Sequence, residues 1–414
     1  MTIFSSEQIN DFLASLPAQK DVPAPEGQPI HVVYGGADRF SAGTIAKLGD
    51  IARRSFADNA PDSASLVEIF GIDEVIAAKV HHQVISRLSV CPIEDYRVDF
   101  EDGLGVRSDA DEDEFAVNAA TETRAAMAAD GLSPFFGIRI RPLARPTAPR
   151  ALRTLDLYMS QLLADGGSLP RNFAVTLPKV TSPAEIATLD RALSQMESEF
   201  AIESGSIRIE FLVEEPRAFV SKNGSYELPS FIAAANGRCR GIHLGAYDLL
   251  SSFGVGSSSQ LLGHWFCDYA RTVMQFSTVG LGVWLSDGAT NEMPIGKHRG
   301  VGLTPEQVSE NKHHIRSAWR SHYLNCQRAI DQGIYQGWDL HPAQVPARLV
   351  AEFEYIAKNI DAALARFRSF TENSERSTLT GGVFDDAATG RGLVAFFRRA
   401  IALGAVSSSD ARLQ

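Results

Sequence analysis

Cysteine is scarce in this sequence, and its cysteines lie far apart. The 414 residues include four of them, Cys91, Cys239, Cys267 and Cys326, and no two form a CxxC pair. Zinc ribbons and dithiol redox sites need such pairs, so both kinds of site are excluded. Unpaired cysteines are typical of reducing compartments, and a cytoplasmic protein is therefore expected.

Positive charge and long apolar runs are also lacking. Lysine and arginine together number 39 against 50 aspartates and glutamates, which gives a net charge of −11 at pH 7. A chain with this balance is a poor candidate for binding nucleic acid or an anionic membrane. No apolar stretch approaches the ~20 residues of a membrane span, and residues 1–19 lack the basic segment and apolar run of a secretion signal. Neither nucleic acid nor a membrane is an expected partner.

Several catalytic motifs are absent as well. The sequence contains no GxSxG, HExxH or P-loop pattern, which argues against the enzyme classes that depend on them. The histidine pairs at 81–82 and 313–314 fall on expected helices, where adjacent side chains diverge, so they are not expected to bind a metal.

What the sequence does contain is a regular alternation of strands and helices. Most of its short runs rich in valine, isoleucine and phenylalanine end about 35 to 40 residues apart, the length of one β/α unit in a barrel of eight. This alternation predicts a parallel sheet, and its eight units predict a closed (β/α)8 TIM barrel of the α/β class. A doubly wound sheet would usually have a glycine-rich phosphate turn after its first strand, and here that turn reads GGADRF. The runs end near Gly36, Asp102, Ile140, Val180, Glu215, Asp248, Asp287 and His341.

Capped helix starts and two departures from the alternation complete the predicted architecture. The tetrapeptides SPAE at 182–185 and TPEQ at 304–307 have the residues of a helix start. A helical insertion is expected after the first strand, at about 40–90. The barrel domain is predicted to span 1–372 and a C-terminal helical extension 373–414. The short apolar helix of that extension is expected to cover the barrel or a neighbouring subunit, with a mobile lid as the alternative.

Carboxylates gather where the predicted strands end. The stretch YRVDFEDGLG at 96–105 closes a strand with Asp99, Glu101 and Asp102. Like charges side by side raise one another's pKa, so a plain surface strand has no need of them, whereas a metal or acid–base site does. In a TIM barrel the chemistry lies at the C-terminal ends of the strands. The later predicted strands end with Arg139 and Arg141, Lys179, Glu214 and Glu215, Asp248, Asp287, and Asp339 with His341.

The acids on successive strands favour a metal site over a structural role. Taken singly, each acid is better explained as a helix cap or an ion-pair partner than as a ligand of substrate or metal. Taken together, hard carboxylate oxygens without cysteine or paired histidine ligands suit Mg²⁺ or Mn²⁺.

Together, these residues resemble those of a known family, the HpcH/HpaI aldolase and citrate lyase β-subunit (CitE-like) superfamily, which is related to malate synthase. The matching passages follow the order of the family over nearly the whole predicted barrel, and the chain is similar to a diverged, longer branch. The resemblance implies a TIM barrel and a Mg²⁺-dependent carbon–carbon lyase or aldolase. The passages are DFEDG at 99–103, GIRIRPL at 137–143, TLPKV at 176–180, FLVEEP at 211–216, HLGAYDLLSSFG at 243–254 and LHPAQV at 340–345.

The resemblance implies a metal site and an acidic pair beside it. The metal ligands of the family correspond to Glu214, with Glu215 as the less favoured choice, and to Asp248. Its acidic pair corresponds to Glu101 and Asp102.

The resemblance also implies the groups that bind substrate. The substrate-binding arginine of the family corresponds to Arg139. The backbone N–H groups of Gly245, Ala246 and Tyr247 are expected to face the substrate carboxylate, as a loop entering a helix can. Arg141 and Tyr247 stand where relatives commonly have other residues, so the substrate pocket is expected to differ from theirs.

The implied reaction is cleavage or formation of a carbon–carbon bond next to a carbonyl group. Its substrate would be a 2-oxo acid or a malyl-CoA-type 3-hydroxyacyl thioester, and Mg²⁺, or Mn²⁺ in its place, would stabilise the enolate. Glu101, Asp102 and a metal-bound water are the candidates for the base. His341 is a weaker candidate, because Pro342 after it is typical of a helix start. Lys179 is either a charge partner of the acids or a substrate contact.

The use of coenzyme A depends on the arginine-rich stretch at 139–153. Arg145, Arg150 and Arg153 either contact CoA phosphates or pair with acids elsewhere in the chain. The alternative functions are a thioesterase acting on the same substrates and a catalytically inactive metabolite-binding barrel. The length of the chain favours a stand-alone homo-oligomer, as a dimer, trimer or hexamer, over a citrate lyase subunit.

Overall fold

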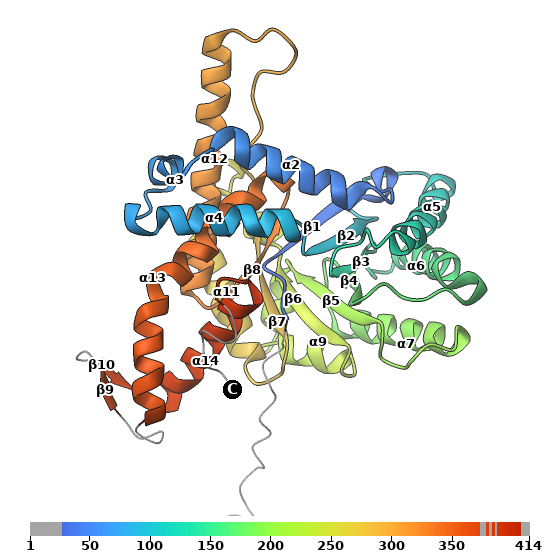
Figure 1. Ribbon diagram of the computed structural model, residues 1–414. Coiled ribbons are helices and arrows are strands. Elements are labelled where there is room, and N and C mark those ends of the chain that lie inside the picture. Colours follow the sequence, from blue (N-terminus) through green and yellow to red (C-terminus); the bar gives the residue numbers. More distant parts are fainter. Residues whose placement is uncertain (1–26, 373–377, 381–382, 386, 407–414) are drawn as a thin grey trace, which may run out of the picture.

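The computed structural model describes residues 27–372, 378–380, 383–385 and 387–406. Parallel strands β1 to β8 close into a barrel in sequence order, with β8 pairing back to β1, and helices surround them (Figure 1). The predicted (β/α)8 TIM barrel is thus confirmed. The strands are β1 (His31–Gly36), β2 (Asp95–Asp99), β3 (Phe135–Arg139), β4 (Phe173–Leu177), β5 (Arg208–Val213), β6 (Cys239–Leu244), β7 (Trp284–Ala289) and β8 (Gln336–Asp339).

The helices that follow the strands begin with the residues that predicted them. Ser182 caps α7 by accepting the N–H of Ala184, and Thr304 and Gln307 form a capping box at the start of α12. Among the described residues, none of the helices is both long and apolar enough to cross a membrane. These helices are α5 (Asp109–Ala128), α6 (Ala148–Leu163), α7 (Pro183–Glu199), α8 (Pro216–Phe219), α9 (Leu228–Ala234), α10 (Ala246–Ser252), α11 (Trp265–Thr278), α12 (Pro305–Asp331) and α13 (Val345–Glu372).

The insertion after β1 consists of helices α2 (Thr44–Asn59), α3 (Ser63–Phe70) and α4 (Glu74–Val90). It crosses in front of α12 and α13 (Figure 1). Phe70 of α3 joins it to α12, with its ring centroid 6.2 Å from that of Trp319 and 5.0 Å from that of Tyr323. The predicted insertion is therefore confirmed, and apolar packing fixes it to the barrel.

The C-terminal segment contains a two-stranded sheet of β9 (Thr378–Thr380) and β10 (Val383–Asp385), followed by α14 (Ala387–Ala402). Helix α14 packs against α13: the Phe397 ring lies 5.5 Å from the Phe367 ring, and Arg399 Nη2 lies 2.7 Å from Glu352 Oε1. The helix thus covers part of its own chain, while the division into two domains at residue 372 stays a prediction.

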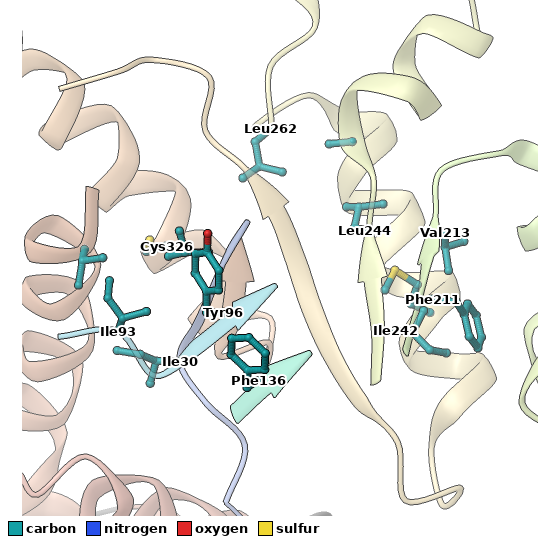
Figure 2. Packing of buried hydrophobic residues seen from close by; sticks show 14 of the residues in the cluster. Ile30, Ile93, Tyr96, Phe136, Phe211, Val213, Ile242, Leu244, Leu262 and Cys326 are labelled. Carbon is teal, nitrogen blue, oxygen red and sulfur yellow. The ribbon is translucent and has the colours of Figure 1, made fainter. Parts of the chain in front are cut away.

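The outer face of the barrel strands forms the apolar core. Figure 2 shows Phe136 of β3, Phe211 of β5, and Ile242 and Leu244 of β6 in this layer. Successive residues of a strand point to opposite faces, so these positions meet the surrounding helices. They account for the valine, isoleucine and phenylalanine in the predicted strands.

The inner face of several strands is charged instead. Glu210 of β5 lies at the centre of a buried network: its Oε2 is 2.7 Å from Arg97 Nη2 and 3.0 Å from His243 Nε2, and its Oε1 is 2.7 Å from Arg240 Nη2. Burial alone would raise the pKa of Glu210, but Arg97 and Arg240 hold it well below its usual value. This paired network fills the barrel below the mouth.

Candidate active site

The turn after β2 is organised by Asp99, the last residue of that strand. Asp99 Oδ1 accepts the N–H of Glu101 at 3.0 Å, and Oδ2 accepts the N–H of Gly103 at 2.7 Å. Residue 103 must be glycine, because a Cβ there would overlap the Asp99 carboxylate. Asp99 is thus used inside the turn, and it presents Glu101 and Asp102 at the end of the strand.

Arg139, at the end of β3, ties this turn to the barrel. Its Nε and Nη2 bond to the two oxygens of Asp99 at 2.6 and 2.5 Å, and its Nη1 lies 3.1 Å from Glu101 Oε2. The guanidinium is buried, with its carbon 4.9 Å from the Tyr34 ring and 5.3 Å from the Trp338 ring. A two-point ion pair and two flanking rings fix its position. Most of the donors of Arg139 are therefore occupied by carboxylates of the protein.

Lys179, just after β4, links the two halves of the site. Its backbone N–H donates to Glu214 Oε1 at 2.5 Å. Its ammonium bonds to Glu101 and, at 3.1 Å, to Asp102. The residue has φ = 52°, a left-handed conformation that is unfavourable for a long side chain. Of the two roles predicted for Lys179, the structure contains the contacts of a charge partner.

Glu214 follows β5 and is buried beside this lysine. Burial raises the pKa of Glu214 to about 8; Asp248 and Glu101 add to the rise, while Lys179 and Arg139 oppose it. A Cβ at Gly245 would overlap the Glu214 side chain, so glycine at this position lets the end of β6 approach the carboxylate.

Asp248 lies in the first turn of α10 and is exposed. Its negative charge reaches Glu214 and Lys179, since it raises the pKa of both. Within the described part of the chain, Asp248 has no hydrogen-bond or ion-pair partner. Its carboxylate is therefore available to a ligand.

The amides predicted to bind the substrate carboxylate are not equivalent. The N–H of Gly245 donates to Val213 O at 3.0 Å and so belongs to the barrel. This bond leaves Ala246 and Tyr247, in the first turn of α10, for the predicted role. The Tyr247 side chain reaches the end of β7, where its hydroxyl donates to Ala289 O at 2.7 Å.

The other strand-end acids have structural roles. Asp287 pairs with Arg271 of α11 at 2.8 Å, and Asp339 pairs with Arg348 at 2.7 Å and with His322 at 2.9 Å, all outside the barrel. Burial lowers the pKa of His322, but Cys326 and Asp339 outweigh it and raise that pKa to about 9. His341 Nδ1 accepts the N–H of Ala343. His341 thus begins a helix, as its proline neighbour predicted.

The arginine-rich stretch after β3 is mostly bound to α5. Arg150 and Arg153 lie 2.5 and 2.7 Å from Asp113, and Arg141 lies 2.7 Å from Glu112. Arg145 is exposed and has no partner among the described residues. Of the two readings of this stretch, pairing with acids elsewhere in the chain accounts for Arg150 and Arg153.

Sequence reasoning missed Tyr34 and Trp338, which complete the wall of the site around Arg139. Their rings lie 4.5 Å apart and come from the neighbouring strands β1 and β8. The signal was present in the alternation of strand residues, which puts Trp338 on the inner face and Asp339 on the outer one.

The site fits a magnesium ion held by few protein ligands. Glu214 Oε1 is occupied by the Lys179 amide, while Oε2, like the Asp248 carboxylate, has no partner in the described part of the chain. Among all the residues that the structure describes, no three or more His, Cys, Asp or Glu side chains form a group that could hold a metal. Mg²⁺ commonly uses one or two carboxylates and keeps several waters, whereas a closed zinc site needs four ligands. Glu214 and Asp248 are the residues that fit.

Comparisons with known proteins agree with the predicted fold. The chain resembles a citrate lyase of Burkholderia xenovorans LB400, with TM-score 0.63 and 17% identity over 94% of this chain and 96% of that one. It resembles the CitE protein of Mycobacterium tuberculosis in complex with magnesium, acetoacetate and coenzyme A, with TM-score 0.50 and 20% identity over 89% and 97%. A Haloferax volcanii malate synthase matches with TM-score 0.50 and 11% identity over 86% and 88%.

These likenesses confirm the predicted resemblance as one of fold. No curated protein matches the sequence. A family model described as "Domain of unknown function (DUF6986)" matches residues 14–414. The chain therefore belongs to the DUF6986 family, and this member has the barrel fold of the citrate lyase, CitE and malate synthase structures named above.

Proposed function

We propose that this protein is a Mg²⁺-dependent carbon–carbon lyase or aldolase that acts on a 2-oxo acid or a malyl-CoA-type 3-hydroxyacyl thioester. The observation that carries the proposal is the charged cluster at the barrel mouth. There a buried Glu214 with a raised pKa lies beside a free Asp248 and is joined through Lys179 to Glu101 and Asp102. The likeness in fold to a CitE protein that binds magnesium and acetoacetate supports the proposal.

Glu214 and Asp248 would hold the metal. The Lys179 amide fixes one oxygen of Glu214 and leaves the other for Mg²⁺ or, in its place, Mn²⁺. When bound, the ion supplies a Lewis acid beside the carbonyl oxygen of the substrate. Glu215, half-buried at the start of α8, has no side-chain hydrogen bond there. It is the matched residue against which the role of Glu214 can be measured.

Glu101 is the proposed general base. Burial raises the pKa of Glu101 even though Arg139 and Lys179 oppose the rise, which brings it closer to the pH at which proton transfer is efficient. In the cleavage direction Glu101 would accept the proton of the substrate hydroxyl while the adjacent carbon–carbon bond breaks. The hydroxyl carbon becomes a carbonyl, and the carbon that keeps the electron pair is then protonated.

Asp102 and the cations would orient rather than react. Burial would raise the pKa of Asp102, but Lys179 lowers it overall, so Asp102 stays a carboxylate and keeps the ammonium in place. Arg139 holds the carboxylates of Asp99 and Glu101, and its remaining donors are proposed to bind substrate. The amides of Ala246 and Tyr247 are proposed to bind the substrate carboxylate. Of Arg145, Arg150 and Arg153, only Arg145 is proposed to contact the phosphates of a CoA thioester, because the other two are paired with Asp113.

The experiment combines metal binding with product analysis. Mg²⁺ binding is measured by calorimetry for the wild type, Glu214→Gln, Asp248→Asn and the control Glu215→Gln. The proposal expects binding to be lost in the first two variants and kept in the control. Malyl-CoA is then supplied, and the oxo acid and the free thiol are assayed separately.

Each product pattern has one interpretation. Oxo acid released together with acetyl-CoA, only with Mg²⁺, supports the lyase. Free thiol without oxo acid would assign the site to a thioesterase. Mg²⁺ binding without turnover of either proposed substrate class, the 2-oxo acid or the thioester, would assign it to an inactive metabolite-binding barrel.

A further inference from the structure

The outward face of α11 consists of aromatic side chains in water. Trp265 is 62% exposed, Tyr269 56% and Phe276 70%. Thr272, also exposed, lies between them, and we call these four residues the α11 stripe. The opposite face of the same helix is buried in the ordinary way, through residues such as Cys267 and Met274. The helix is therefore apolar on both sides, which is typical of a helix with a neighbour on each.

The exposed aromatic area of α11 is large for a single helix. An aromatic side chain has a surface area of roughly 150–250 Å². The exposed fractions of Trp265, Tyr269 and Phe276 therefore leave about 400 Å² of aromatic surface in contact with water. Leu261, 49% exposed, precedes the helix, and Val279, 79% exposed, follows it. Together they bring the face toward the roughly 800 Å² that one partner contributes to a standard protein interface. Patches of this size mark sites of association.

The stripe carries no charge and has the spacing of a helix–helix seam. Its residues are separated by four, three and four positions, which is the heptad pattern of helices that pack along their length. Asp268, beside the stripe, is bound to Arg271 at 2.8 Å and to Arg328. A lipid surface requires no such register, whereas a second helix does. The occupant with the matching chemistry is therefore an apolar helix face.

We propose that the α11 stripe is the two-fold interface of a homodimer, in which α11 packs antiparallel against α11 of a second copy. A two-fold axis requires a surface to be complementary to itself. In the antiparallel arrangement Trp265 faces Phe276 of the partner subunit, and Tyr269 faces Thr272 of the partner subunit. The small threonine at the centre leaves room for the tyrosine ring, so large and small side chains alternate across the seam. A parallel pair would set tryptophan against tryptophan.

The first test places a charge at the centre of the seam. Because Thr272 is exposed in the single chain, Thr272→Lys should leave the fold intact, and an unchanged circular dichroism spectrum would verify this. Light scattering at micromolar concentration should give a dimer for the wild type and a monomer for Thr272→Lys. The control is Val75→Lys on α4, because Val75 is 86% exposed and lies outside the stripe. It should remain a dimer.

Three outcomes would overturn the proposal. The first is a wild type that is monomeric at every concentration. The second is a Thr272→Lys variant that dimerises as tightly as the wild type. The third is a monomeric wild type that co-sediments with phosphatidylcholine vesicles unless Trp265 is replaced by serine, which would assign the stripe to a membrane surface.

The second test determines the orientation of the two helices. Trp265 and Phe276 are eleven residues apart, about 16 Å along a helix, which is too far for a disulfide between two copies of the same variant in an antiparallel pair. Trp265→Cys and Phe276→Cys are therefore oxidised separately and as a mixture. A disulfide-linked dimer in the mixture alone supports the antiparallel interface. Cross-linking of either variant alone would indicate a parallel one, and no cross-link in any sample would exclude contact between the helices.

Discussion

Lys179 offers the sharpest test of how the site is assembled, because its backbone and its charge can be varied separately. Its φ of 52° is left-handed, which is unfavourable by about 1–2 kcal/mol for a residue with a Cβ. Glycine removes this strain but gains about 0.4–1 kcal/mol of freedom in the unfolded chain. We therefore expect Lys179→Gly to be more stable than Lys179→Ala by about 0.5–1 kcal/mol, although both lose the same ammonium.

The assay is urea denaturation, with the midpoint compared at constant slope. Ala201 provides a matched control, because it is exposed, has φ = 51° and lies between α7 and the start of β5, at the end of the barrel opposite the site. Ala201→Gly should gain stability by a similar amount without changing Mg²⁺ binding. Equal midpoints for Lys179→Gly and Lys179→Ala would refute the reasoning about strain.

The charge of Lys179 makes a separate prediction. The lysine interacts favourably with Glu214, Glu101 and Asp248, as the rise in its own pKa indicates. A cation at this position repels a second cation, so both variants should bind Mg²⁺ more tightly than the wild type and turn over more slowly. Calorimetry at pH 7.5 checks the affinity. Unchanged affinity in both variants would show that the ammonium and the metal do not share these carboxylates.

Three further predictions concern buried groups. The folded pKa of His322 is raised from 6.5 to about 9, so its contribution of about 3 kcal/mol to the free energy of unfolding should be complete below pH 6.5 and lost as the pH rises to 9. Because Glu214 also titrates in this range, the contribution is measured by urea denaturation as the difference between the wild type and His322→Gln. Gly245→Ala should lower stability by about 1–3 kcal/mol and weaken Mg²⁺ binding, because the added methyl group overlaps Glu214. Arg139→Met should lower the free energy of unfolding by about 3–5 kcal/mol, because two buried carboxylates lose their partner, and a loss below 1 kcal/mol would contradict the role assigned to the arginine.

The sequence predicted the barrel well because its signals are local. Capped helix starts such as Ser182 and Thr304 depend on a few neighbouring residues, and the repeat length of β/α units depends only on geometry. The turn at Asp99 was not predicted, although its signal is also local: a carboxylate followed by glycine four residues later can close a turn through backbone N–H groups.

The orientation of strand-end residues was harder to predict. A shift of one residue along a strand moves a side chain from the mouth of the barrel to the face that contacts the helices. The ends of strands predicted from sequence vary by more than one residue. Trp338 therefore enters the site while Asp339, next to it, pairs with Arg348 outside. The partners of Arg150 and Arg153 lie on another helix, about 40 residues earlier in the chain, so no local pattern contains them.

Burial is the main cause of the high pKa of Glu214, and the excess of negative charge at the mouth adds to it. Five carboxylates face two cations there, a formal charge of −5 + 2 = −3, and burial makes the excess unfavourable. With its pKa near 8, Glu214 binds a proton at neutral pH, which reduces the charge to −2. A bound Mg²⁺ would displace that proton and leave −3 + 2 = −1, so metal binding should release close to one proton at pH 7 and almost none at pH 9. Calorimetry in buffers of different ionisation enthalpy measures this number. The groups are Asp99, Glu101, Asp102, Glu214 and Asp248, with Arg139 and Lys179.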